Sequence, residues 1–166
     1  AVKHTDTVGK NRYLMGWGDR FSLEVKSATS IEISTESIFN QGYYAINEEP
    51  ELLSLNPGTS GYNRIALVVV RFEQDENTGD EEAYLRVIEG TPTTGSAAEP
   101  AFENGNLLEG ALVDEVPIWR IPINGIDVGT PVKILSDVFE PWSSIHWPRP
   151  VELYSDPEGT NGRLGY

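Results

Sequence analysis

The 166-residue sequence contains no cysteine, one methionine and only two histidines. The absence of cysteine excludes disulfides, thiolate metal sites and a cysteine nucleophile, so stability has to come from packing. No run of about 18 apolar residues is present, and we expect no membrane insertion. Basic residues are also scarce, and the formal net charge of −14 would repel a phosphate backbone. Nucleic-acid binding is therefore not expected.

The supply of catalytic groups is equally small. His4 and His146 are far apart in the sequence, and two isolated histidines rarely form a metal site. A catalytic site requires a nucleophile with its base, a metal cluster or paired carboxylates in a cleft, and no such set converges here. We therefore expect neither enzymatic activity nor a cofactor.

One acidic segment, residues 75–82, offers several oxygen ligands. Asp75, Asn77 and Asp80 are its candidate metal ligands. An EF-hand loop counted from Asp75 requires Gly at its sixth position, where this chain has Asp80. The favoured interpretation is thus a solvated turn, and no metal site is predicted.

Glycine and proline are plentiful instead. Sixteen Gly and eleven Pro interrupt the chain too often for long helices, while 39% hydrophobic residues and four Trp exclude simple disorder. A chain of this length forms one well-buried core. The composition predicts a single all-β domain.

The most apolar stretch covers residues 63–72, NRIALVVVRF, where six of ten residues are Ile, Ala, Leu or Val. Both pleat faces of this strand would be apolar, which is typical of a central strand. Residues 83–89 form a second run after an Asp-, Asn- and Gly-rich linker. We therefore predict a central β-hairpin over residues 63–89.

Shorter strands are predicted on both sides of this hairpin. From Arg20 the sequence alternates, with Phe21, Leu23 and Val25 on one face, and Ile31 and Ile33 continue the pattern. Residues 37–46 hold Gly42 within an aromatic run, which indicates a bulge or bend. The remaining predicted strands are residues 52–55, 116–123 and 132–135.

Two segments leave alternatives open. Residues 107–113 fit a short helical turn or an irregular strand equally well, because Gly110 weakens the helical spacing. Pro117 and Pro122 cannot donate ladder hydrogen bonds, so residues 116–123 belong at a sheet edge or at bulges.

The spacing of strands and turns predicts an antiparallel two-sheet β-sandwich, jelly-roll-like, with extended terminal arms. We expect an N-terminal arm over residues 1–18 and the sandwich over 19–139. A Trp- and Pro-rich C-terminal arm and exit peptide would cover 140–166.

The order of segments resembles the β-rich proteins of phage tails and prophage baseplates. In these, a (F/Y)xxGxYY-like strand precedes a GxxxRID(R)(I/V)VLR-like strand, a strand closing in KGTP, a small-residue loop and a proline-containing strand pair. The corresponding segments here are FNQGYYAI (39–46), GYNRIALVVVRF (61–72), YLRVIEGTP (84–92), EPAF (99–102) and VPIWRIPING (116–125). This chain departs from the pattern at Asn63, where Asp is usual, and in its longer acidic loop.

The resemblance implies a non-enzymatic virion protein of the tail tip, baseplate or fibre, involved in assembling the host-attachment apparatus. Its partners would be other tail or baseplate proteins and further copies of itself, with a homotrimer favoured. Four apolar residues near the chain ends are the interface candidates, because oligomers bury such anchors: Trp17, Trp142, Ile145 and Trp147.

The alternative function is a carbohydrate-binding module for host-surface polysaccharide. Flat aromatic faces stack on pyranose rings while nearby polar groups bind the hydroxyls. The stacking candidates are Trp119, Trp142, Trp147 and Tyr44. Such aromatics are more often core or interface anchors, so this hypothesis comes second.

Overall fold

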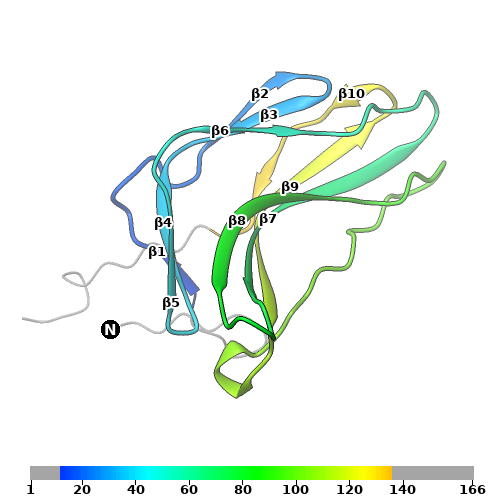
Figure 1. Ribbon diagram of the computed structural model, residues 1–166. Coiled ribbons are helices and arrows are strands. Elements are labelled where there is room, and N and C mark those ends of the chain that lie inside the picture. Colours follow the sequence, from blue (N-terminus) through cyan, green and yellow to red (C-terminus); the bar gives the residue numbers. More distant parts are fainter. Residues whose placement is uncertain (1–11, 136–166) are drawn as a thin grey trace, which may run out of the picture.

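The computed structural model describes residues 12–135, and it confirms an all-β antiparallel sandwich (Figure 1). Within this range no helix is long and apolar enough to cross a membrane. The strands are β1 (Arg12–Leu14), β2 (Leu23–Ser27), β3 (Ser30–Ile33), β4 (Glu36–Asn40), β5 (Tyr43–Asn47), β6 (Glu51–Ser54), β7 (Asn63–Gln74), β8 (Glu81–Glu89), β9 (Val113–Asn124), β10 (Asp127–Val128) and β11 (Val132–Lys133).

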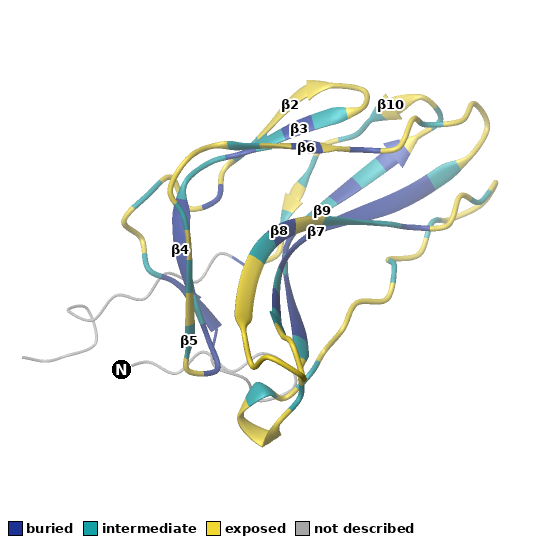
Figure 2. Cartoon of the chain, viewed as in Figure 1, coloured by how far each residue is buried: buried dark blue, intermediate teal, exposed yellow. Residues whose placement is uncertain are grey.

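The first layer is a curled sheet in the order β10-β9-β7-β8, with β11 also paired to β9. Strand β7 pairs along its length with β8 on one side and β9 on the other. Seven consecutive residues of β7, from Arg64 to Val70, are buried, and this strand is dark along most of its length in Figure 2. The predicted central hairpin is confirmed, with β7 as the central strand and β8 at the edge.

The second layer consists of two small sheets, β1-β4-β5 and β2-β3-β6. The chain passes from β3 into β4 and from β5 into β6, while β3 pairs with β6 and β4 with β5. The two sheets are therefore one long hairpin that bends between its halves, as the corner above β4 and β5 shows (Figure 1).

The core lies between these layers. Ala66, Val68, Val70 and Phe72 of β7 face Ile31 and Ile33 of β3, Ile38 of β4 and Leu14 of β1 across one buried cluster. Strand β1 lies within the predicted N-terminal arm, and Leu14 is fully buried. Strand β1 pairs with β4 through Tyr13–Phe39 and Leu14–Ile38.

The interpretation of Gly42 as a bulge or bend within one strand is wrong. Gln41 and Gly42 form the two-residue turn between β4 and β5, with φ of 51° and 93°. Such hairpin turns need positive φ at both central residues, which glycine adopts without strain. The Tyr- and Phe-containing segment is thus two paired strands.

The half-buried strand predicted from Arg20 begins later than expected. Arg20 and Phe21 have φ of 58° and 51°, so they form a left-handed turn before β2 starts at Leu23. Phe21 is buried as predicted, but Val25 is 40% exposed. Strand β2 is an edge strand of the β2-β3-β6 sheet, and its residues after Leu23 are exposed.

The open alternatives for two segments are resolved. Residues Leu107–Glu109 form a single 3-10 turn, and Gly110 ends it with φ of 93°. Strand β9 has neighbours on both sides, so it is not an edge strand. A bulge shifts its register with β7 between the pairs Val68–Trp119 and Val69–Pro117, which accommodates one of its prolines.

Candidate interaction surface

An aromatic row crosses the outer face of the β1-β4-β5 sheet. Tyr13 lies opposite Phe39, and Phe39 lies opposite Tyr44. The rings of Tyr13 and Phe39 stack with their centroids 5.9 Å apart. Exposure rises along the row, from 8% at Tyr13 to 56% at Tyr44. Because side chains alternate along a strand, the neighbouring residues of β4 and β5 face the core.

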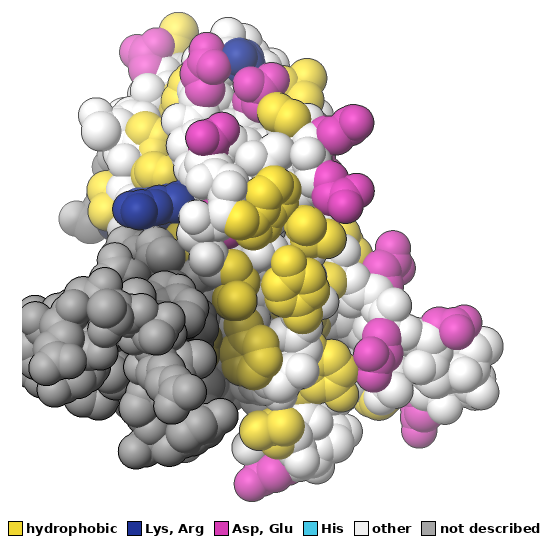
Figure 3. All heavy atoms as spheres, turned by 90° about the vertical axis from the view of Figure 1, so that its left-hand side faces the viewer, with side chains coloured by type: hydrophobic (Ala, Val, Ile, Leu, Met, Phe, Trp, Pro, Cys, Tyr) yellow, Lys and Arg dark blue, Asp and Glu magenta, His cyan; other side chains and the backbone are white. Residues whose placement is uncertain are grey.

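More apolar surface adjoins this row. Ile46, two residues beyond Tyr44 on the same face of β5, is 47% exposed, and Trp17 is 50% exposed. The segment with Trp17 follows β4 closely, since a Cβ on Gly18 would lie 2.5 Å from the Thr35 carbonyl oxygen. Hydrophobic side chains gather along the middle of this face in Figure 3. We call Tyr13, Phe39, Tyr44 and Ile46 the aromatic face.

A buried ionic network fixes the sheet under this face. Asp114 of β9 is fully buried and accepts two hydrogen bonds from Arg12 Nη2, at 3.0 and 2.8 Å. It also accepts from Asn40 Nδ2 at 2.9 Å and Gln41 Nε2 at 2.8 Å. A buried carboxylate is tolerated when it is paired and hydrogen-bonded in this way. The network ties β1 and β4 to β9, so the aromatic face has a rigid support.

Trp119 is engaged elsewhere. Its Nε1 donates to the carbonyl oxygen of Phe21 at 2.6 Å, and Lys133 Nζ lies 5.3 Å from the ring centroid. Lys133 also donates to the Arg20 carbonyl oxygen. Burial lowers the pKa of Lys133, although the charge of Glu36 acts in the opposite direction. Trp119 therefore holds the left-handed turn at Arg20 and packs against the core.

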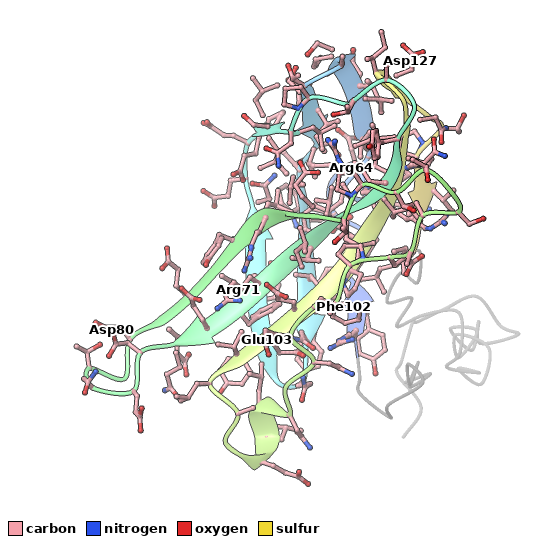
Figure 4. All side chains as sticks on the ribbon, turned by 90° about the vertical axis from the view of Figure 1, so that its right-hand side faces the viewer. Arg64, Arg71, Asp80, Phe102, Glu103 and Asp127 are labelled. Carbon is pink, nitrogen blue, oxygen red and sulfur yellow. The ribbon has the colours of Figure 1, made fainter. Side chains whose placement is uncertain are left out.

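The acidic loop after β7 is organised by its own backbone. Asp75 Oδ1 accepts from the N–H groups of Asn77 and Thr78, at 2.7 and 3.0 Å. These two bonds lower the pKa of the Asp75 carboxyl. Among residues 12–135 no group of three or more His, Cys, Asp or Glu is placed to hold a metal ion. Asp80 is labelled at the tip of the hairpin in Figure 4.

The structure separates the predicted binding residues. Tyr44 lies on the aromatic face and Trp119 lies in the five-stranded sheet, so the two do not form one stacking platform. Trp142, Ile145 and Trp147 lie outside the described residues. Tyr13 and Phe39 were missed by the sequence analysis, because their alignment with Tyr44 depends on a hairpin turn at Gly42. Known proteins add no guide, since no family model, curated protein or solved structure matches the chain.

Proposed function

We propose that the protein is a non-enzymatic structural component of a phage virion, in the tail tip, baseplate or fibre, that binds neighbouring subunits through its aromatic face. The observation that carries this proposal is the exposure of Tyr44 and Ile46, at 56% and 47%, on one sheet face. The order of sequence segments that resembles tail and baseplate proteins supports the same assignment. Its partners are other tail or baseplate proteins and further copies of the chain, with a trimer as the proposed homo-oligomer.

The chemistry of the aromatic face suits protein binding. It combines large side chains with a support that is already rigid, so little conformational entropy is lost on association. Aromatic anchors of this kind dominate the energetics of interfaces. Contiguous exposed apolar surface also marks sites of interaction with other proteins.

Replacing Tyr44 with Ser tests the proposal. We expect the variant to remain folded by circular dichroism but to shift from a defined oligomer to monomer by mass photometry. Leu52→Ser is the matched control, since Leu52 is 63% exposed on β6, in the other small sheet. A wild-type chain that is monomeric and binds no tail protein would overturn the proposal, as would equal effects of the two changes.

Glycan binding is the second candidate, and the exposed ring of Tyr44 beside Phe39 favours it. The predicted partner Trp119 contributes no free indole N–H, because Phe21 accepts it. Titration with host-surface polysaccharide is the test, and Tyr44→Phe should retain binding while Tyr44→Ser loses it. Binding that is unchanged in Tyr44→Ser would exclude this face as the glycan site.

A further inference from the structure

Two basic residues of this acidic chain have no carboxylate partner. Among residues 12–135, every other arginine and lysine forms an ion pair with an acidic side chain, at 2.6 to 3.0 Å: Arg12, Lys26, Arg64, Arg71, Arg86 and Arg120. Arg20 and Lys133 form none, although the whole chain has 26 acidic residues and only 12 basic ones. Their positive charges are therefore available to an anion from outside the subunit.

These two unpaired cations lie together. Lys133 Nζ donates a hydrogen bond to the carbonyl oxygen of Arg20 and lies 5.3 Å from the centroid of the Trp119 ring. Burial lowers the pKa of Lys133, the charge of buried Glu36 acts in the opposite direction, and the charge of Arg20 lowers this pKa again. An anion bound beside both cations would offset the repulsion between them. We call Arg20 and Lys133 the cation pair.

The backbone that carries Arg20 is held in place. Arg20 and Phe21 are the central residues of a turn in which the N–H of Ser22 donates to the Asp19 carbonyl oxygen at 3.0 Å, and both have positive φ. This left-handed conformation is unfavourable for residues other than glycine. Burial of the Phe21 side chain and the hydrogen bond from Trp119 stabilise it. The exposed Arg20 side chain therefore starts from a preorganised backbone, which lowers the entropic cost of binding.

An acidic hairpin tip of the same protein complements the cation pair. Residues 75–82, between β7 and β8, include five acidic side chains and no basic one, and all of them are exposed. The hairpin end labelled at Asp80 projects from the body of the sandwich in Figure 4. Asp75 Oδ1 orders this loop by accepting from the N–H groups of Asn77 and Thr78. We call residues 75–82 the acidic tip.

Within one chain the acidic tip does not reach the cation pair. Lys133 pairs with Trp119, which lies opposite Val68 of β7. The tip begins only after Gln74, and the strand from Val68 to Gln74 is about 20 Å long at the usual rise per residue. The pair Gln74–Glu81 joins β7 to β8 right up to the tip, so the tip cannot fold back along the strand. A contact between the two surfaces therefore needs a second copy of the chain.

We propose that the cation pair of one copy binds the acidic tip of a neighbouring copy, and this contact rests on the assembly function above. Guanidinium and ammonium groups bind carboxylates through charge-assisted hydrogen bonds. The two surfaces differ, so the contact is head-to-tail, and head-to-tail contacts form rings when the rotation between copies closes. A ring of this kind agrees with the proposed trimer. The charges fix the orientation of the copies, while the aromatic face provides the buried apolar surface.

Charge reversal in the full-length protein tests the contact. Arg20→Glu and Asp80→Lys should each weaken assembly at least tenfold, measured by mass photometry over a dilution series, because like charges then face each other. Both changes in one chain pair opposite charges again and should restore assembly. Lys26→Glu and Asp127→Lys are the matched controls, since they change the net charge equally at exposed positions elsewhere. We expect them to leave assembly unchanged within about twofold, with all variants folded by circular dichroism.

Three results would overturn the proposal. Assembly that ignores either reversal shows that this surface makes no contact. Equal losses in the controls assign the effect to net charge alone. A double variant that stays dissociated shows that Arg20 and Asp80 do not meet. In each of these cases the wild-type oligomer persists and the assembly function stands, whereas a monomeric wild-type protein sinks the assembly function as well.

Discussion

The outer faces of the two layers have similar chemistry but different surroundings. On the five-stranded sheet, Ile65, Leu67 and Val69 point away from the core, yet they are no more than 3% exposed. The loop between β8 and β9 runs beside this sheet in Figure 4 and is bonded to it, with Glu103 N–H donating to Glu115 Oε2 at 2.7 Å. On the β1-β4-β5 sheet, by contrast, Tyr44 is more than half exposed.

Charge marks the same difference. Arg71 and Arg86 both bind Glu115 Oε1 on the covered face, at 2.9 and 3.0 Å. The aromatic face consists of Tyr, Phe and Ile. An apolar sheet face can be covered by a loop of the same chain or by a partner. Among residues 12–135, the loop between β8 and β9 covers the outer face of the five-stranded sheet, while Tyr44 and Ile46 on the aromatic face remain about half exposed. The aromatic face is therefore the apolar sheet face that is accessible to a partner.

The largest effect is expected on the covered face. Leu67→Ala should lower the free energy of unfolding by about 2 to 4 kcal/mol, because it leaves a cavity under the loop. The same change at Thr94, which is exposed in that loop, should be nearly silent. Urea unfolding of both variants measures the difference, and equal losses would mean that the loop does not seal the face.

A smaller effect is expected where the loop is bonded to the sheet. Glu115→Gln keeps the shape of the side chain but removes the charge that Arg71 and Arg86 share. We expect a loss of about 1.5 to 3 kcal/mol, which is typical of hydrogen bonds to charged groups. Hydrogen exchange should also become faster at the N–H of Glu103. Unchanged exchange there would contradict the assigned contact.

The uncovered face should be insensitive in the isolated subunit. Tyr44→Ser should change unfolding of the monomer by less than about 0.5 kcal/mol, since surface changes away from special features are nearly neutral. The monomer is obtained by dilution, with its mass checked by light scattering. A loss comparable to that of Leu67→Ala would show that Tyr44 belongs to the core of its own subunit.

The smallest effect is expected from acid, which should lower the stability contributed by an ion pair on the covered face. The hydrogen bond from Arg71 lowers the pKa of Glu73 below its ordinary value of 4.5. This pair therefore adds stability above pH 4.5 that is lost as the pH falls through the lowered value. Urea midpoints of wild type and Glu73→Gln should converge between pH 7 and pH 3. A constant gap would exclude ionisation of Glu73 as the cause.

The sequence predicted the fold where patterns are local. The Val-rich run of β7 and the acidic hairpin loop each carry their own signal, and both were located correctly. The aromatic face was missed because it depends on one turn: with Gly42 in a bulge, Phe39 and Tyr44 are merely near in sequence, whereas with Gly42 in a hairpin they are paired. Burial of Asp114 was equally hidden, since its partner Arg12 lies 102 residues away.

That separation also sets the order in which the molecule can fold. Strands β1 to β6 leave the ribosome first, but their inner faces pack against β7 and β9. The hydrogen bond from Arg12 cannot form until Asp114 has also been synthesised. At synthesis rates of 5–20 residues per second, about 5 to 20 s pass between the two. Folds dominated by such distant contacts also form slowly, in milliseconds to seconds. The first half of each new chain therefore spends longer exposed to premature aggregation than the folding reaction itself requires.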